Sequence, residues 1–341
     1  MIVVGLSYGL GYRLDWSQDI GRAEDEGEIA EVPAPAASPG AARPPEAPVM
    51  ASAPAAELRP TPGDAAWDKM VGGLESLAAR YPGRVAICLK DLRTGKSWSR
   101  GADDLFPAAS LIKVPIMVAA FYKIRDGQLS LDERLTVTRR NRVGGSGSLK
   151  WRPDGTKLTV RDLLVYMINE SDNTATKMIL ERLGMGYVQQ QFPRMGLLYT
   201  GIYEDGMSIR GGRVARENYT TAGEMSMLLE KIYRGEAVDQ TSSGFMMDIL
   251  KKPKAIASRL AKGMPMDWEI AHKTGLLRQA CHDSAIFFTP SGDYALTVLT
   301  GENRSYSQAK HFISKLARVT FARYAGPRYL AQATRRRRHH Y

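Results

Sequence analysis

The order of strand-like and helix-like segments between residues 64 and 324 constrains the fold of this chain most strongly. The first part contains a helix-type pattern at 67–78 and strand-type patterns at 84–92 and 97–100. Helices are expected in the middle of the region, at 110–125, 160–169, 172–183 and 221–233. The last part contains strand-type runs and a closing amphipathic helix, at 269–274, 284–288, 294–300 and 307–324.

Strands at both ends of this region, with helices between them, predict one antiparallel sheet assembled from the two ends of the chain. We therefore expect an α/β (α+β) fold, with helices flanking the sheet and an inserted all-helical lobe. The sheet lobe would hold residues 64–108 and 241–326, and the helical lobe residues 109–240. A cleft between two such lobes is a common place for a small-molecule site.

The two ends of the chain do not resemble the 64–326 domain. Residues 1–63 begin with an apolar stretch too short to span a bilayer, followed by an acidic and then an Ala/Pro-rich segment. We expect a leader and a disordered tether, and hence export to the periplasm, the medium or an envelope-tethered position in a bacterium. The signal sequence looks incomplete, because no basic residues precede its apolar part.

The formal net charge of +11 raises the question of a polyanionic partner. Part of the excess lies in the basic run 335–338, within a tail (327–341) that we expect to be disordered. No nucleic-acid-reading element accompanies the charge, so we expect no nucleic-acid binding. Contact of the tail with anionic envelope polymers or lipid stays open.

The chain has two cysteines, Cys88 and Cys281, and neither has the spacing of a metal ligand. Five scattered histidines add no zinc pattern, so we expect no metal and no cofactor. Each cysteine lies in or beside an apolar run, which favours a buried free thiol. A disulfide between them stays open, because sequence alone does not place the two side chains.

Three short strings carry groups suited to serine acyl transfer: Ser110-x-x-Lys113, Ser171-Asp172-Asn173 and Lys273-Thr274-Gly275. The first string alone is weak, and it occurs again at 307–310. The second and third are each expected well under once by chance. Each string has a purely structural reading, as a helix cap, a snorkelling lysine or a turn. Their joint occurrence in this order favours the catalytic reading.

The surroundings of Ser110 separate it from the second match at Ser307. An almost wholly apolar helix follows Ser110, so Ser110 and Lys113 should lie one turn apart at the end of a core helix. Burial would lower the pKa of Lys113 toward that of a useful base. The helix that begins near Ser307 has the pattern of a surface helix.

These strings resemble the motif set of the class A β-lactamases and related penicillin-recognising serine hydrolases. The segments 158–164 and 218–225 also resemble this family, and the similarity covers about 64–324. The resemblance implies that Ser110 is the acyl-accepting nucleophile and that Lys113 activates it. Ser171 would pass a proton to the leaving nitrogen, and the backbone N–H groups of Ser110 and Leu276 would form the oxyanion hole.

The resemblance also implies the substrate-binding residues. Asn173 would hold the side-chain amide of the substrate and help to fix the lysine base. Lys273 and Thr274 would bind the substrate carboxylate, and Gly275 would let its strand approach the ligand. Asp172 is expected to brace the fold.

One family feature is missing, because the Glu-x-x-Leu-Asn string of the omega loop does not occur in this chain. In the family this glutamate drives the water that releases the acyl group. Asp205 and Glu204 lie at about the right place in the sequence to substitute for it.

Three functions stay open at this point. The first is a serine β-lactamase-like hydrolase that opens the β-lactam amide through an acyl-enzyme on Ser110. The second, favoured by the missing string, is a D-alanyl-D-alanine carboxypeptidase or penicillin-binding enzyme that acts on cell-wall peptides. The third is a non-catalytic cell-wall-binding module, against which the full set of nucleophile residues argues.

Overall fold

The computed structural model describes residues 64–204, 206, 216–251, 258–264 and 268–325 of this 341-residue chain. The leader and tether at 1–63 and the tail at 327–341 lie outside the described residues. Residues 60–341 form one compact unit, and the description below concerns that unit. No helix in the described part is long and apolar enough to cross a membrane.

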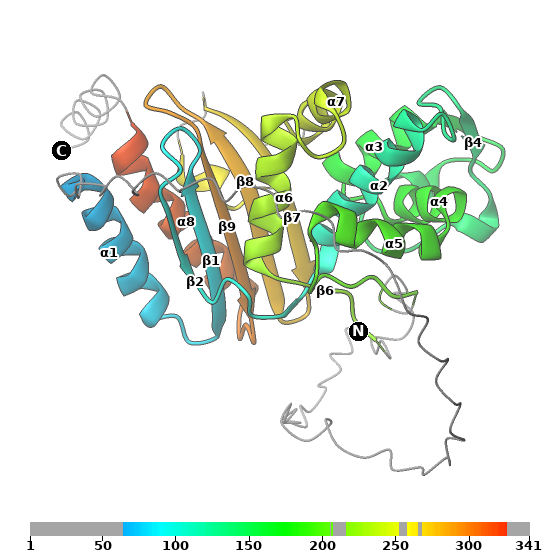
Figure 1. The fold of residues 1–341 in the computed structure, drawn as a ribbon. Coiled ribbons are helices and arrows are strands. Elements are labelled where there is room, and N and C mark those ends of the chain that lie inside the picture. The colour runs from blue at the N-terminus through cyan, green and yellow to red at the C-terminus, as the bar shows by residue number, and fades with distance from the viewer. Residues whose placement is uncertain (1–63, 205, 207–215, 252–257, 265–267, 326–341) are drawn as a thin grey trace, which may run out of the picture. The chain divides into compact units, whose positions relative to one another are not determined.

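A five-stranded antiparallel sheet forms the centre of the unit, in the order β2-β1-β9-β8-β7 (Figure 1). The strands are β1 (Arg84–Asp91), β2 (Ser97–Arg100), β7 (Glu269–Leu277), β8 (Ala280–Phe288) and β9 (Tyr294–Gly301). Strand β1 pairs with β9 along its whole length, from Arg84 opposite Gly301 to Asp91 opposite Tyr294. The expected antiparallel sheet built from both ends of the chain is therefore confirmed.

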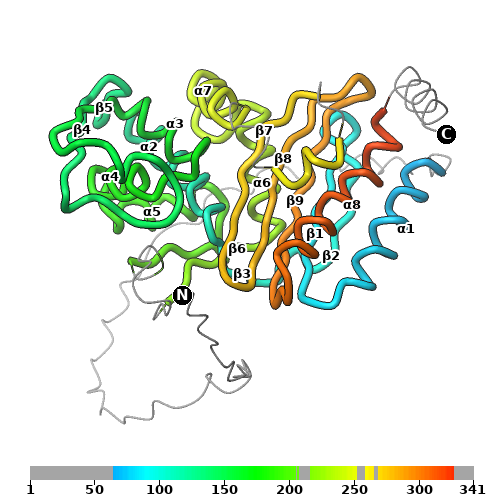
Figure 2. Tube along the Cα trace, turned by 180° about the vertical axis from the view of Figure 1, so that it is seen from behind, coloured from blue at the N-terminus to red at the C-terminus, as the bar shows by residue number. Residues whose placement is uncertain are grey.

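Helices cover both faces of this sheet, as Figures 1 and 2 show from opposite sides. Helices α1 (Ala65–Ala79) and α8 (Tyr306–Tyr324) contact each other on one face, and α6 (Ala222–Arg234) packs on the other. The alternation of side chains along β1 explains the two layers, because successive residues point to opposite faces. Ile87 and Leu89 pack with α1 and α8, whereas Ala86 and Cys88 belong to the cluster on the α6 side.

This alternation also settles the state of the two cysteines. Cys88 belongs to the apolar cluster on the α6 face and Cys281 to the cluster on the α1–α8 face. Side chains on opposite faces of a sheet cannot meet the geometry of a disulfide. Both are buried free thiols, which confirms the favoured prediction.

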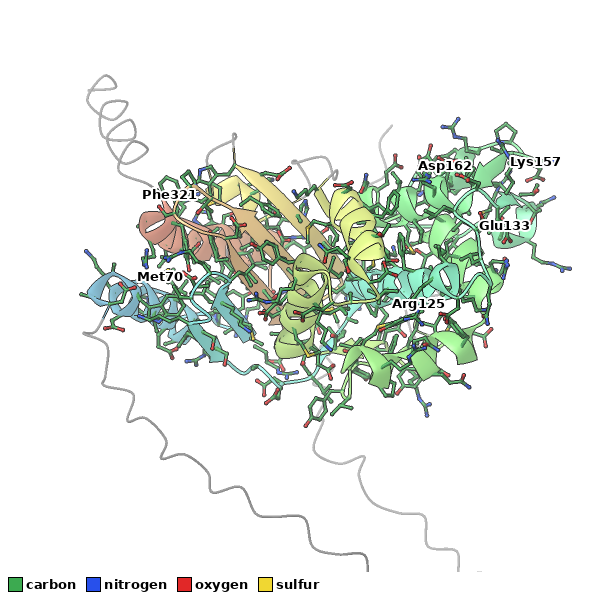
Figure 3. All side chains as sticks on the ribbon, turned by 45° about the horizontal axis from the view of Figure 1, so that its top comes forward. Met70, Arg125, Glu133, Lys157, Asp162 and Phe321 are labelled. Atoms are coloured by element: carbon green, nitrogen blue, oxygen red, sulfur yellow. The ribbon has the colours of Figure 1, made fainter. Side chains whose placement is uncertain are left out.

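The helical lobe is built around α2 (Lys113–Arg125), in which every residue from Lys113 to Tyr122 is buried. Four helices pack against α2: α3 (Val160–Asn169), α4 (Asn173–Leu183), α5 (Met185–Met195) and α7 (Gln240–Lys251). Short elements complete the described chain: β3 (Phe106–Pro107), η1 (Ala109–Ile112), β4 (Arg134–Thr136), η2 (Arg139–Asn141), η3 (Leu149–Trp151), β5 (Lys157–Thr159), β6 (Tyr219–Thr220) and η5 (Ala261–Gly263). Figure 3 shows Lys157 and Asp162 at the end of the unit away from Met70 and Phe321.

The structure differs from the sequence expectation in a few segments. Helix α6 lies within the range 109–240 that the sequence assigns to the helical lobe, yet it packs against β1, β8 and β9. Strand β8 starts at Ala280 and not, as the sequence predicted, at 284. The missed part of the strand contains two polar residues, His282 and Asp283, which are fully buried. Polar residues in a strand hide its hydrophobic pattern, so the run looked shorter than the strand is.

Candidate active site

Ser110 lies in the short 3-10 helix η1, which leads directly into α2. The sequence predicted one continuous helix from 110 to 125. In a 3-10 helix the side chains at i and i+3 eclipse each other, so the tighter turn aligns Ser110 with Lys113. The Ser110 Oγ lies 3.2 Å from the Lys113 Nζ. Ala109, just before the serine, has a left-handed φ of 47°, a strained backbone of the kind found at functional sites.

Lys113 is the first residue of α2, and its side chain is only 2% exposed. Burial lowers the pKa of Lys113 to about 7, although the nearby Asp172 carboxylate acts in the opposite direction. The Nζ donates to the Ser171 carbonyl at 2.6 Å and to the Asn173 Oδ1 at 2.8 Å. These oxygens can only accept, so they occupy two N–H bonds of a neutral amine. Its lone pair is then left for a hydroxyl proton.

Asp172 holds the backbone around this lysine in place. Its carboxylate caps α4 by accepting from the Ala175 N–H, and it also accepts from the Leu149 N–H, both at 2.8 Å. Gly147 lies so close that an added Cβ would fall 2.1 Å from the Asp172 Oδ2. Asp172 thus ties the 144–149 loop to the start of α4, and its position suits the bracing role expected from the sequence.

Lys273 reaches the hydroxyl of Ser171 from the sheet lobe. It lies on β7, is 2% exposed, and donates to the Ser171 Oγ at 3.0 Å. Burial lowers the pKa of Lys273 well below its ordinary value, and the nearby charges of Lys113 and Arg259 lower it further. The Ser171 Oγ lies 3.2 Å from the Lys113 Nζ, so one hydroxyl contacts both amines.

Gly275 brings β7 close to η1. A Cβ on Gly275 would lie 3.0 Å from the Ala109 Cβ and 3.2 Å from the His282 ring. We expect Gly275→Ala to displace η1 by a fraction of an ångström and to slow acylation of Ser110 by about 10- to 100-fold, because reacting groups tolerate little misplacement. Stopped-flow labelling with a fluorescent penicillin measures this rate. Gly72→Ala, in α1 with open space around it, is the control, and equal rates for both variants would contradict the role of Gly275.

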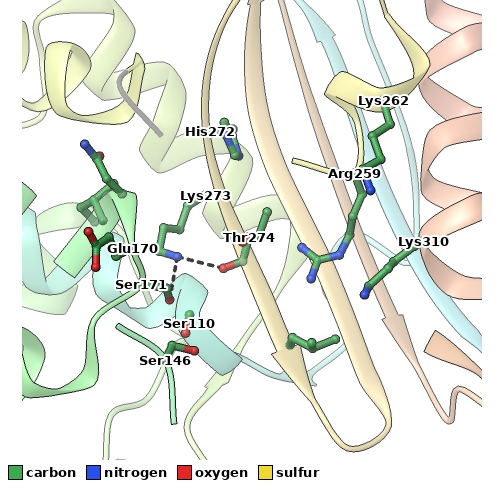
Figure 4. A pocket seen from close by; sticks show the side chains of 13 residues that line it. Ser110, Ser146, Glu170, Ser171, Arg259, Lys262, His272, Lys273, Thr274 and Lys310 are labelled. Carbon is green, nitrogen blue, oxygen red and sulfur yellow. Dashed lines mark hydrogen bonds between the residues drawn. The ribbon is translucent and has the colours of Figure 1, made fainter. Parts of the chain in front are cut away.

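A cavity of about 330 Å³ opens at these groups (Figure 4). Its walls include five of the residues expected at the site and several others: Ser110, Ser146, Ile168, Asn169, Glu170, Ser171, Arg259, Lys262, His272, Lys273, Thr274, Leu276 and Lys310. Asn173 joins the site through its bond to the Lys113 amine. The structure thus brings together Ser110, Lys113, Ser171, Asn173 and the 273–276 segment.

Arg259 is a wall residue that the sequence did not indicate. It is buried, and its Nη1 donates to the His282 carbonyl at 3.0 Å. Its backbone N–H donates to the Asp283 carboxylate at 2.6 Å, so β8 fixes it beside the cavity. A single arginine outside any motif carries no signal in the sequence, because only the fold places it here.

A family model described as "Beta-lactamase enzyme family" matches residues 72–324, which include all three strings. This chain belongs to the β-lactamase enzyme family. The fold class predicted from the sequence, a β-lactamase/transpeptidase-like fold, is confirmed by the solved structures that this family member resembles.

Curated and structural relatives agree with this membership. Beta-lactamase VEB-1 of Pseudomonas aeruginosa is 24% identical over 281 residues, 76% of this chain and 92% of that protein. A β-lactamase of Streptomyces cellulosae is 28% identical over 257 residues, 73% of this chain and 81% of that protein. A PBP-A mutant solved as an acyl-enzyme complex with penicillin G is 28% identical, with a TM-score of 0.68, covering 76% of this chain and 97% of that one.

The carboxylate expected to drive deacylation is not placed by the structure of this family member. Asp205 lies outside the described residues. Glu204 is exposed and does not belong to the described lining of the cavity. The carboxylate in that lining is Glu170. Among the described residues, no cluster of three or more His, Cys, Asp or Glu side chains could hold a metal ion.

Proposed function

We propose that this protein is a serine β-lactamase-like hydrolase that opens the β-lactam amide through an acyl-enzyme on Ser110. The observation that carries the proposal is the 3.2 Å contact between the Ser110 Oγ and the Lys113 Nζ. The amine is buried, and the serine lines a cavity of about 330 Å³. Family membership and the names of the relatives support β-lactams as the substrates.

The contacts suggest how the protons move. The Ser110 Oγ attacks the lactam carbonyl carbon as its proton passes to the neutral Lys113 amine. The carbon–nitrogen bond then breaks, and the lactam nitrogen takes a proton from the Ser171 hydroxyl, which Lys113 reprotonates across 3.2 Å. Water then cleaves the ester and returns Ser110 to its free form. The backbone N–H groups of Ser110 and Leu276 would stabilise the oxyanion.

Lys273 and Thr274 would bind the substrate carboxylate, with Arg259 as a further cation on the same wall. We expect Lys273→Ala to raise KM by about 10- to 100-fold, because a charge-assisted hydrogen bond contributes about 1.5–3 kcal/mol. Steady-state kinetics with penicillin G measures the change. Lys157→Ala, exposed on β5 and outside the cavity lining, is the control. An unchanged KM in Lys273→Ala would show that the carboxylate is held elsewhere.

Deacylation separates the two enzymatic candidates, and a time course with a chromogenic cephalosporin tests it. We expect sustained turnover, and we expect Asp205→Asn to make the acyl-enzyme accumulate. The missing omega-loop string favours the second candidate, a D-alanyl-D-alanine carboxypeptidase that acts on cell-wall peptides. A single stoichiometric burst followed by a stable adduct would establish that candidate instead.

We also propose that the protein acts outside the cytoplasm. The apolar start of the chain and the Ala/Pro-rich segment within 1–63 support export to the periplasm, the medium or an envelope tether. The basic run 335–338 would then face anionic envelope polymers or lipid. Fractionation of cells that produce the full chain tests this location, and recovery in the cytoplasm would contradict it.

A further inference from the structure

Charge is unevenly distributed along the wall of the cavity. All of its lysines and its arginine lie in the sheet lobe, on β7, around η5 and on α8: Arg259, Lys262, Lys273 and Lys310. The carboxylate of the described lining, Glu170, comes from the end of α3 in the helical lobe. In Figure 4, Glu170 and the outer cations Arg259, Lys262 and Lys310 lie on opposite sides of Ser171 and Lys273. A ligand that spans the cavity past Ser110 therefore meets opposite charges at its two ends.

Glu170 is held in position without being neutralised. The Ser148 hydroxyl donates to its Oε2 at 2.6 Å, and no cation among the described residues forms an ion pair with it. Glu170 is the C-cap of α3 and immediately precedes Ser171, whose backbone has a left-handed φ of 53°. The carboxylate is thus fixed next to the reacting groups, with capacity left to accept a further hydrogen bond.

Asn169 offers a second acceptor at the same end of the cavity. Its Oδ1 is buried and has no hydrogen-bond partner in the described part of the chain, although the residue lines the cavity. A buried carbonyl oxygen without a partner is costly, and a donor supplied by a ligand would satisfy it. Asn173, which would hold the substrate's side-chain amide, starts α4 three residues after Glu170.

We propose that Glu170 and Asn169 form a subsite for a primary ammonium group in the acyl side chain of the substrate. The preferred substrates are then zwitterions: the carboxylate binds at Lys273 and the ammonium binds at Glu170, with the scissile amide between them at Ser110. An ammonium group has three donors and matches a carboxylate beside an amide oxygen. This inference rests on the proposed function, because it concerns the orientation of the same substrate.

A pair of penicillins that differ only in this group provides the test. Ampicillin carries an α-ammonium in its side chain, and penicillin G has a methylene there. We expect Glu170→Gln to lower the ratio of kcat/KM for ampicillin to kcat/KM for penicillin G by about tenfold. Asn169→Leu should lower the same ratio by a smaller factor, and Glu170→Asp should restore part of it. Glu181→Gln, an exposed glutamate on α4 outside the cavity lining, is the matched control and should leave the ratio unchanged.

The ratio separates recognition from folding, since a structural role of Glu170 through Ser148 would affect both penicillins alike. An unchanged ratio in Glu170→Gln, with either normal or equally reduced rates for the two compounds, overturns the ammonium subsite and leaves the hydrolase proposal intact. If the wild-type protein is acylated by neither penicillin, the proposed function fails first and the subsite fails with it. Intact-protein mass spectrometry of the wild type with penicillin G, together with an assay for the hydrolysed product, identifies that case directly.

Discussion

Ser110→Ala abolishes acyl-enzyme formation and lowers kcat/KM for a chromogenic cephalosporin by at least ~10⁴-fold, since loss of a nucleophile removes the covalent route altogether. Steady-state kinetics and covalent labelling by a fluorescent penicillin measure the two losses.

The chain supplies its own control for this variant. Ser307 begins the same Ser-x-x-Lys pattern but is exposed near the start of α8, so Ser307→Ala should retain the wild-type rate. Residual labelling of Ser110→Ala at the wild-type rate, or loss of labelling in Ser307→Ala, would assign the nucleophile to another residue.

The acylation rate should rise with pH and level off above about pH 7. Only the neutral form of Lys113 can accept the Ser110 proton, and burial lowers the pKa of this lysine to about 7. Below that pH the amine is protonated, so the second-order acylation rate should fall about tenfold for each pH unit. A lysine with an ordinary pKa of 10.5 would still be gaining activity at pH 9.

Stopped-flow acylation between pH 5 and pH 9 measures this profile in the wild type and in Lys113→Ala. The variant should lose at least ~10³-fold in rate and the pH dependence with it, since general-base catalysis contributes about 10²- to 10⁴-fold. Lys123→Ala, near the C-terminal end of α2, is the control for a lysine of the same helix. A wild-type rate that still rises tenfold per pH unit up to pH 9, or the same profile in Lys113→Ala, would exclude Lys113 as the base.

The two amines on either side of Ser171 also link substrate binding to this base. The Lys113 ammonium lowers the pKa of Lys273, and burial lowers the pKa of both amines. A substrate carboxylate at Lys273 would stabilise the ammonium there, and that charge would hold Lys113 in its neutral form. We infer that binding of the carboxylate helps to prepare the base, so esterified β-lactams should acylate Ser110 more slowly than the free acids.

Elements with an uninterrupted pattern could be predicted well from the sequence. The strand Ser97–Arg100 and the helix Val160–Asn169 were placed at their observed bounds, because a turn or cap ends each of them. The three strings were also enough to indicate which residues meet at the site. The side chains in these strings supply the groups that serine acyl transfer needs. The order of the strings along the chain agrees with the fold that brings them together.

Other features depend on contacts between distant segments, which no local pattern encodes. The left-handed backbone of Ala109 and the 3-10 turn at Ser110 lie against β7, where Gly275 makes room for them. Helices α5 and α7 were not expected. In α5, a proline inside the helix (Pro193) and a high content of glutamine obscure the pattern. Arg259 and Glu170 enter the cavity wall only because the two lobes bring them there.

The most direct test of the central claim is peptide mapping of the wild-type chain after brief exposure to penicillin G at pH 7.5. We predict one adduct with the mass of the intact penicillin, on the peptide that contains Ser110. An adduct on any other residue, or neither an adduct nor hydrolysed penicillin with a folded protein across pH 5–9, would contradict an acyl-enzyme formed by Ser110 with Lys113 as its base.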